Sequence, residues 1–180
     1  MSDLIKKTKV VPFINTGTVT VPKWTQIKKT TTFTLTMNPQ TKTFDFISSE
    51  TPQNEIDSYQ PSLSQSLTMF KGEPDYEVIF DMLYKRATGA DAHRDVLIAF
   101  YKEKGSYTPQ GDTESISCYK AWKIDALVTI NQMDTVNENI DFDLALNEIT
   151  NGAVTLNGTG EPTFKKALLK GKFSQLQHND

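Results

Sequence analysis

The sequence is poor in the residues that most often carry enzyme chemistry. It has a single cysteine, Cys118, and two histidines, His93 and His178. One cysteine excludes an internal disulfide and is typical of folding in a reducing cytosol. No grouping of histidine, cysteine and carboxylate residues has metal-site spacing, and a nucleophilic cysteine would need a histidine partner. The sequence therefore predicts no catalytic site, no metal site and no cofactor.

Long apolar runs are also absent. The longest, at 96–101, has six residues, whereas a membrane-spanning helix needs roughly 20. The N-terminus has lysines without an apolar core behind them, which does not fit a secretory signal. With 37% hydrophobic and 23% charged residues among 180, the chain has the balance of one soluble domain. No membrane partner is expected.

Basic residues are missing from one long stretch. Residues 124–164 hold seven acids and no Lys or Arg, although residues 1–29 hold six lysines and residues 165–172 hold four. A solvated acidic strand pair explains this most simply, since charge runs usually face water. The alternative is a surface kept acidic for a function.

Three patterns could suggest chemistry or nucleic-acid recognition. Asp141 and Asp143 alternate on a strand, which could suit acid–base or metal chemistry, but the further ligands of a calcium loop are missing. The glycine-rich run at 158–162 lacks the Gly-Lys-Ser/Thr ending of a phosphate loop and is predicted to be a turn. No basic patch interleaves with the aromatic residues, so sequence-specific nucleic-acid binding is not expected.

Period-two alternation predicts a mainly β fold. Residues 25–37 alternate apolar side chains with threonines, and a turn at 38–41 leads to a second strand at 43–47, which makes a hairpin. Further strands are expected at 63–70, 95–102, 117–133, 139–147 and about 153–157. One helix is predicted over about 74–88, because Pro74 and the acids after it favour a helix start and apolar residues follow at helical spacing.

The remaining segments read as connections. Residues 1–23 show no period and are interrupted by Pro and Gly, which predicts an extended arm. Residues 48–61 form a long polar loop, 104–115 a second one, and a short amphipathic helix could begin at 164. The expected architecture is an antiparallel β-sandwich or open barrel with one flanking helix. The predicted division is an N-terminal arm (1–23), the sandwich domain (24–162) and a basic C-terminal extension (163–180).

Several segments, in this order, resemble the tail tube proteins of long-tailed, siphovirus-type bacteriophages. They are Trp-Thr-Gln-Ile at 24–27, Met-Asn-Pro-Gln-Thr at 37–41, Tyr-Gln-Pro-Ser at 59–62, Phe-Lys-Gly-Glu-Pro-Asp at 70–75 and the run at 154–162. The similarity covers residues 24–162. No single motif is specific, and none is catalytic; the order and spacing carry the resemblance.

The resemblance implies a structural virion protein and not an enzyme. Six subunits would form a ring, the inner sheets would join into one barrel around a lumen, and stacked rings would make the conduit for DNA ejection. The implied partners are further copies of the chain, a tape measure protein in the lumen, tail terminator and tail tip proteins, and genomic DNA in transit. The implied location is the virion tail, assembled in the host cytoplasm.

The resemblance gives the acidic stretch a role. A lumen lined by acids and threonines would let DNA pass without sticking, because basic groups would hold its phosphates. The candidate lumen-facing residues are Asp125, Asp141, Asp143, Thr30, Thr32 and Thr34. The long loop could reach another subunit, with Glu50, Glu55, Asp57 and Tyr59 as its candidate contacts.

Three alternatives remain open. The inner tube of a contractile injection system or tail-like bacteriocin would have a similar fold. A carbohydrate-binding β-sandwich module would present a planar row of exposed aromatics, whereas Trp122 lies on an apolar parity and Trp24 at the start of a strand. A small β-rich enzyme would need the catalytic constellation that is missing.

Overall fold

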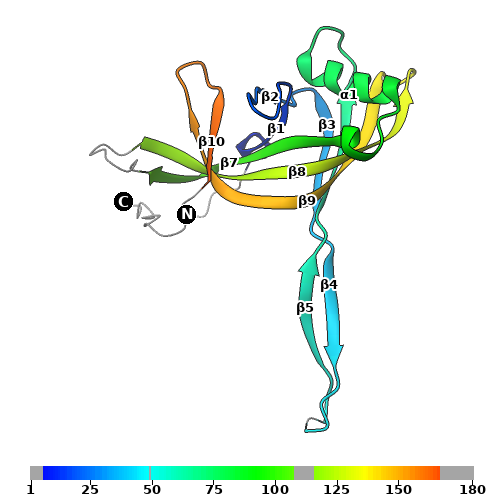
Figure 1. The fold of residues 1–180 in the computed structure, drawn as a ribbon, viewed down its shortest axis with the longest axis vertical. Coiled ribbons are helices and arrows are strands. Elements are labelled where there is room, and N and C mark those ends of the chain that lie inside the picture. The colour runs from blue at the N-terminus through cyan, green and yellow to red at the C-terminus, as the bar shows by residue number, and fades with distance from the viewer. Residues whose placement is uncertain (1–5, 49, 108–115, 167–180) are drawn as a thin grey trace.

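A computed structural model describes residues 6–48, 50–107 and 116–166. Within these ranges the chain is mainly β, with one α-helix (Figure 1). The strands are β1 (Val10–Asn15), β2 (Trp24–Gln26), β3 (Thr30–Thr36), β4 (Pro39–Phe44), β5 (Gln53–Tyr59), β6 (Ser62–Thr68), β7 (His93–Tyr107), β8 (Ile116–Asp134), β9 (Asn139–Leu156) and β10 (Pro162–Lys166). The helices are η1 (Lys7–Lys9), α1 (Pro74–Lys85) and η2 (Gly89–Ala92).

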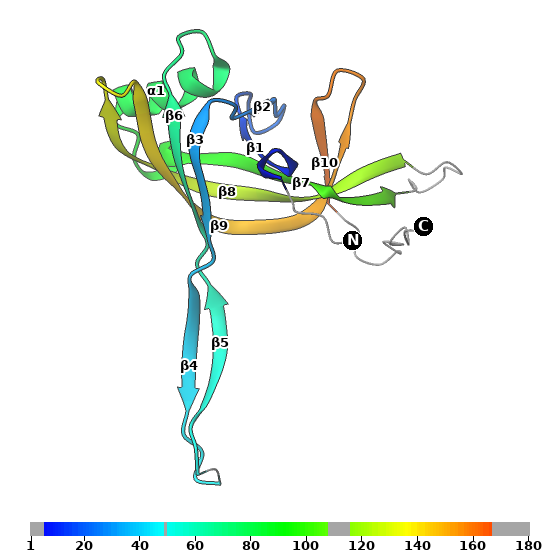
Figure 2. The same cartoon turned by 180° about the vertical axis from the view of Figure 1, so that it is seen from behind.

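One antiparallel sheet of eight strands makes the body of the molecule. Its order is β2-β1-β7-β8-β9-β6-β3, with β10 also paired to β9. The two longest strands, β8 and β9, serve both halves of the sheet, and β3 and β6 cross the direction of β7 (Figures 1 and 2). Register irregularities in the β8–β9 ladder accompany this bend, as bulges increase twist. The predicted antiparallel sandwich or open barrel with one helix is confirmed.

The main core lies between the bent halves of this sheet. Alternate residues of β8 and β9 point into it, and α1 covers it with Ile79 and Met82. The fully buried side chains of the two long strands include Ile124, Ile140, Phe142 and Leu144. This is the inward parity that the alternation in the sequence predicts. A smaller cluster on the other face of β1 and β7 includes Phe13 and Leu97.

The helix begins where the sequence predicts and ends slightly earlier. Pro74 occupies its first turn, and the buried Asp75 accepts a hydrogen bond from the Lys28 backbone N–H at 3.2 Å, which ties α1 to the start of β3. Arg86 adopts a left-handed conformation with φ 51°, and its N–H bonds to the Leu83 carbonyl. That C-cap stops the helix at Lys85, three residues before the predicted end.

The irregular arm predicted over residues 1–23 is wrong for residues 10–15. These residues form β1, which pairs with β7 inside the sheet and is buried except at Val10. Ile14 packs in the main core and Phe13 in the smaller cluster. A strand buried on both faces shows no polar alternation, so a period of two does not reveal it in the sequence. The domain boundaries themselves stay a prediction.

The hairpin predicted between residues 25–37 and 43–47 is also wrong. β3 pairs with β6, and β4 pairs with β5, so residues 30–68 form one long two-stranded ribbon. Its joint lies at Asn38, which has φ 43° and whose carbonyl accepts the Gln60 N–H. Part of the predicted loop at 48–61 is therefore strand β5. We call residues 39–59 the arm; it projects away from the body (Figures 1 and 2).

Three further boundaries differ from the prediction. β7 continues to Tyr107, into the expected loop at 104–115, of which 108–115 lie outside the described residues. The strands expected at 139–147 and 153–157 are one strand, β9. It passes through Gly152, where the Phe164 ring lies so close to the backbone that a side chain would clash with it. Residues 164–166 belong to β10, not to a helix, and the rest of the expected C-terminal extension lies outside the described residues.

Candidate functional site

One face of the sheet is polar across four strands. The segments are β3, β6, residues 139–147 of β9 and residues 128–134 of β8, and none contains Lys or Arg. Their other face packs on the main core. Two rows cross the strands on the polar face: Thr34, Ser64, Asp143 and Thr129 in one, and Thr32, Ser66, Asp141 and Gln132 in the other. We call this surface the polar face.

The two carboxylates of the polar face are held by neutral donors. Asp143 accepts a hydrogen bond from Ser64 Oγ at 2.5 Å and from Asn131 Nδ2 at 2.7 Å. Asp141 accepts from Gln132 Nε2 at 2.6 Å and from Asn139 Nδ2 at 3.0 Å. These donors orient the carboxylates without neutralising them. The polar face therefore presents negative charge in a shallow depression of about 360 Å³.

The structure brings together four of the six predicted lumen-facing residues. Asp141, Asp143, Thr32 and Thr34 share the polar face. Thr30 does not, because the register irregularity before Thr32 sets it opposite the core residue Leu67. That these residues face a lumen stays a prediction.

Asp125 also lies apart from the polar face. It is four residues before Thr129 on β8, roughly 13 Å along the strand, and lies opposite Asp95 of β7. The His93 Nδ1 atom is 3.1 Å from each of its carboxylate oxygens. An imidazole–carboxylate pair can move a proton, but no nucleophile is hydrogen-bonded to it among the described residues. Nothing in this arrangement favours catalysis.

The polar face lies between two strand edges that lack a partner in the described residues. β3 is the last strand of the sheet and pairs only with β6. The pairing of β8 with β7 ends at Leu127, so residues 128–134 pair only with β9. Exposed edges of this kind are templates for pairing with another chain.

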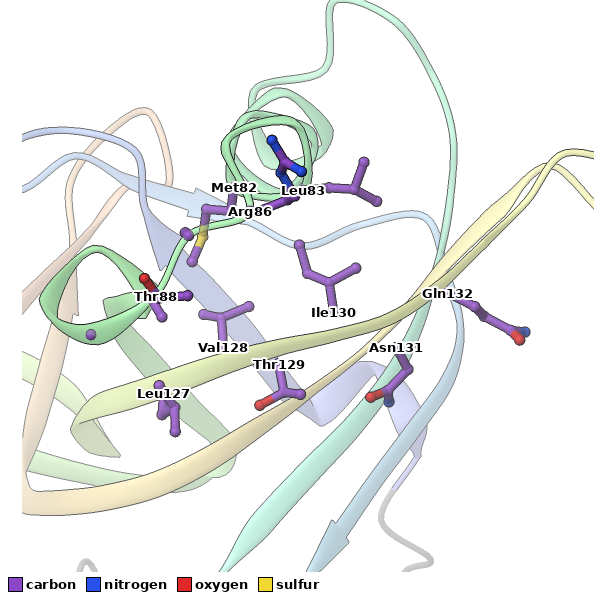
Figure 3. Close-up of a pocket in the computed structure, with 13 residues that line it drawn as sticks. Met82, Leu83, Arg86, Thr88, Leu127, Val128, Thr129, Ile130, Asn131 and Gln132 are labelled. Carbon is purple, nitrogen blue, oxygen red and sulfur yellow. The ribbon is translucent and has the colours of Figure 1, made fainter.

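A cavity opens at the free edge of β8 (Figure 3). It has a volume of about 610 Å³ and lies between this edge and the C-terminal turn of α1. Val128 and Ile130 point toward Met82 of the helix, whereas Thr129 and Asn131 point to the opposite side of the strand. The apolar floor of the cavity thus belongs to the core side of β8.

The arm carries the predicted loop contacts and several apolar side chains. Glu50, Glu55, Asp57 and Tyr59 are all exposed. So are Phe46, Ile47 and Ile56, which were not among the predicted contacts, and the Phe46 ring stacks on Phe44 at 5.6 Å. The signal was present in the run Phe-Asp-Phe-Ile at 44–47. An arm with exposed apolar groups and acids is suited to a partner surface.

The described residues contain neither a cluster suited to a metal ion nor a helix suited to a membrane. Within residues 6–48, 50–107 and 116–166, no group of three or more His, Cys, Asp or Glu could hold a metal ion. No helix in those ranges is long and apolar enough to cross a membrane.

Comparison with known proteins finds likeness in structure only. No protein-family model matches the chain, and no curated protein matches it. One similar solved structure is the PVC sheath/tube terminator of an extracellular contractile injection system in the extended state, with 11% identity, a TM-score of 0.50, and coverage of 83% of this chain and 97% of that one. Another is the PVC sheath-tube complex in the extended state, with 13% identity, a TM-score of 0.46, and coverage of 84% and 93%. The first likeness shows a tail-tube-like fold.

Proposed function

We propose that this chain is a structural protein that polymerises as stacked hexameric rings to form the tail tube of a siphovirus-type bacteriophage. The observation that carries the proposal is the polar face, which bears Asp141 and Asp143, no Lys or Arg, and a free strand edge on each side. Joining such edges around a ring closes a barrel with the polar face inside. The tail-tube-like fold supports the same function.

The chemistry of the polar face suits a conduit for DNA. Phosphates bind proteins through Lys and Arg, with release of counterions. A wall of hydroxyls, amides and carboxylates offers no cation, and its carboxylates repel the phosphates. DNA and a tape measure protein could then slide through the lumen without being held.

The arm supplies a contact between rings in this proposal. It projects beyond the sheet, and its acids and exposed apolar side chains have no core to pack against. Stacking would place it, with Tyr59 and Glu55, against a neighbouring ring. Further copies of the chain are thus the main partners, and terminator and tip proteins would close the two ends in a virion tail assembled in the host cytoplasm.

A contractile injection tube is the second candidate. The observation in its favour is the structural likeness to the PVC sheath/tube terminator. Such a tube would share the ring geometry and differ by having a sheath around it. A sheath gene beside the gene for this chain, or a sheath protein retained by purified tubes, would select this candidate.

The two tryptophans do not support the carbohydrate-binding alternative. Such modules use a planar row of exposed aromatics. Here Trp24 and Trp122 are half-buried, Trp24 against the smaller cluster and Trp122 against the main core, where its ring meets Phe100 edge-on at 5.0 Å. The two tryptophans therefore form no such row.

Electron microscopy of the purified, concentrated protein tests the proposal directly. Negative staining should show six-fold rings or hollow tubes, and sedimentation should show polymers that grow with concentration. Tail extract supplies nuclei if the protein alone stays monomeric. Monomers that never form rings, even when nucleated, would sink the proposal, and binding on a glycan array would then favour the carbohydrate-binding module.

Charge reversal tests the lumen assignment. Tubes of the D141K/D143K variant should assemble but retain DNA, with retention that falls steeply as salt rises. The readout is DNA that co-sediments with tubes, together with DNA delivery in infection. A matched control reverses Glu55 and Asp57 on the arm, away from the proposed lumen. Unchanged retention and delivery in D141K/D143K would contradict the assignment.

A further inference from the structure

The main core of the isolated chain is incomplete along the edge of β3. Phe33 and Leu35 lie on its core-facing side, yet both side chains are only half-buried. They line an open cavity of about 790 Å³ with Phe100 and Val10. The hydrophobic effect favours removal of such side chains from water.

The core is also incomplete along the edge of β8. The cavity there is lined by Val128 and Ile130 of the strand and by Met82, Leu83 and Ala87 of the helix region (Figure 3). Met82 and Val128 are buried, but Leu83 and Ile130 are half-exposed. Each edge of the polar face therefore has an apolar opening on its core side.

The two edges are equal in length and run in opposite directions, as an antiparallel pairing between copies requires. Residues 30–36 and 128–134 are seven residues each. Every neighbouring pair in the order β8-β9-β6-β3 is antiparallel, so β3 runs opposite to β8. Around a ring of equivalent copies, β3 of one copy therefore meets β8 of the next in antiparallel direction.

We propose that β3 of a second copy adds to the free edge of β8 and that its Phe33 and Leu35 fill the cavity under α1. This inference rests on the proposed function and specifies the interface within one ring. The two incomplete cores become one continuous core through the junction. Helix α1 thus serves as the lid of the neighbouring chain's edge strand.

The side-chain pattern fixes the register of the junction. Apolar residues of the two strands must share the core side and polar residues the polar face. With Phe33 opposite Ile130, Leu35 falls opposite Val128 and Thr34 opposite Thr129. Shifting β3 by two residues toward β7 would set Leu35 against Ala126, which already pairs with β7. Shifting it the other way would set Phe33 against the polar-face residue Gln132.

Disulfide cross-linking tests the junction without disturbing the core. Thr34 and Thr129 are both exposed, and directly opposed residues of an antiparallel pair lie about 4.5–5.5 Å apart at Cα, within disulfide range. Inside one chain they are three strand spacings apart, roughly 14 Å, so no intramolecular bond can form. Cys118 stays in place because it is buried, and burial raises the pKa of its thiol.

The experiment oxidises assembled T34C/T129C protein and separates it by non-reducing electrophoresis. We expect a ladder that ends at a covalent hexamer and collapses on reduction. The matched control is T34C/N151C, whose second cysteine replaces an exposed residue of β9 away from either edge, and which should stay monomeric.

The outcomes separate the inference from the function. Tubes or rings of T34C/T129C that give no ladder would overturn the junction and leave the proposed function standing. A ladder of equal extent in the control would also overturn it. A ladder in protein that makes only closed rings would support the junction and count against stacking into a tube, and failure of the wild-type chain to form any ring would overturn both.

Discussion

The two halves of the long ribbon between residues 30 and 68 have the same topology but opposite surroundings. At its root, β3 and β6 place Leu63 and Leu67 in the core, where they are 0% and 1% exposed. In the arm, β4 and β5 have every described residue exposed except the half-buried Phe44. An isolated two-stranded hairpin is marginally stable at best in water. The root is thus stabilised by the core of its own chain, whereas the described residues of the arm have no such core beneath them.

The largest expected difference between root and arm is in stability. Leu67→Ala should lower the free energy of unfolding by about 2–5 kcal/mol, because it leaves a cavity in the core. Its matched control, Ile56→Ala in the arm, should change that free energy by less than about 0.5 kcal/mol. Denaturant titration of the unassembled protein measures both. Equal losses would show that the arm shares the core.

Removal of the arm sharpens the comparison. We replace residues 39–59 with Asn-Gly, which suits a two-residue hairpin loop and joins the hydrogen-bonded Asn38 and Gln60. The unfolding midpoint should stay within a few degrees of the wild type, a shift that corresponds to about 1 kcal/mol for a chain of this size. Electron microscopy should show rings that no longer stack. Long tubes from the shortened chain would contradict a role between rings.

The smallest expected effect concerns the turn between β8 and β9, whose polar groups are hydrogen-bonded to one another. At the β8–β9 turn, the Asp134 carboxylate accepts hydrogen bonds from the Asn137 backbone N–H, the Asn137 side-chain amide and the Val136 N–H. These bonds lower the pKa of Asp134, and the bond from the Asn137 backbone has the largest effect. A lowered folded-state pKa gives stability that is present above the unfolded pKa and lost as pH falls through the folded one. The thermal midpoint of Asp134→Asn should therefore lie slightly below wild type at pH 7, and the gap should close in acid. A gap that persists there would point to packing instead.

The sequence predicted best where one face of a strand is buried. Alternation over 117–133 and 139–147 placed Ile124, Ile140 and Phe142 in the core, and Pro74 placed the start of the helix. Alternation did not predict β1, which is buried on both faces, or the pairing of the arm strands, which are buried on neither face. Neither kind of strand alternates, so only tertiary pairing reveals it.

The candidate site was predictable only in part. Spacing set Asp141 and Asp143 on one face, but their pairing with Ser66 and Ser64 of β6 depends on a register between residues 75 and 79 positions apart in the sequence. The register irregularity that separates Thr30 from Thr32 has no signal in a run of identical threonines. The free edge of β8 follows from where β7 begins, at His93, which is a tertiary fact.

The pairing of β1 with β7 and of β6 with β9 also sets how fast the chain folds. Both join residues about 70–90 positions apart, and the loop between such residues must close before their contacts can stabilise the fold. All-β domains of this topology fold in milliseconds to seconds, slower than helical bundles. During that time the edges of β3 and β8 are uncovered in every newly made chain. The concentration of partly folded chains, as well as that of folded chains, therefore sets how often an exposed edge pairs with an incorrect strand.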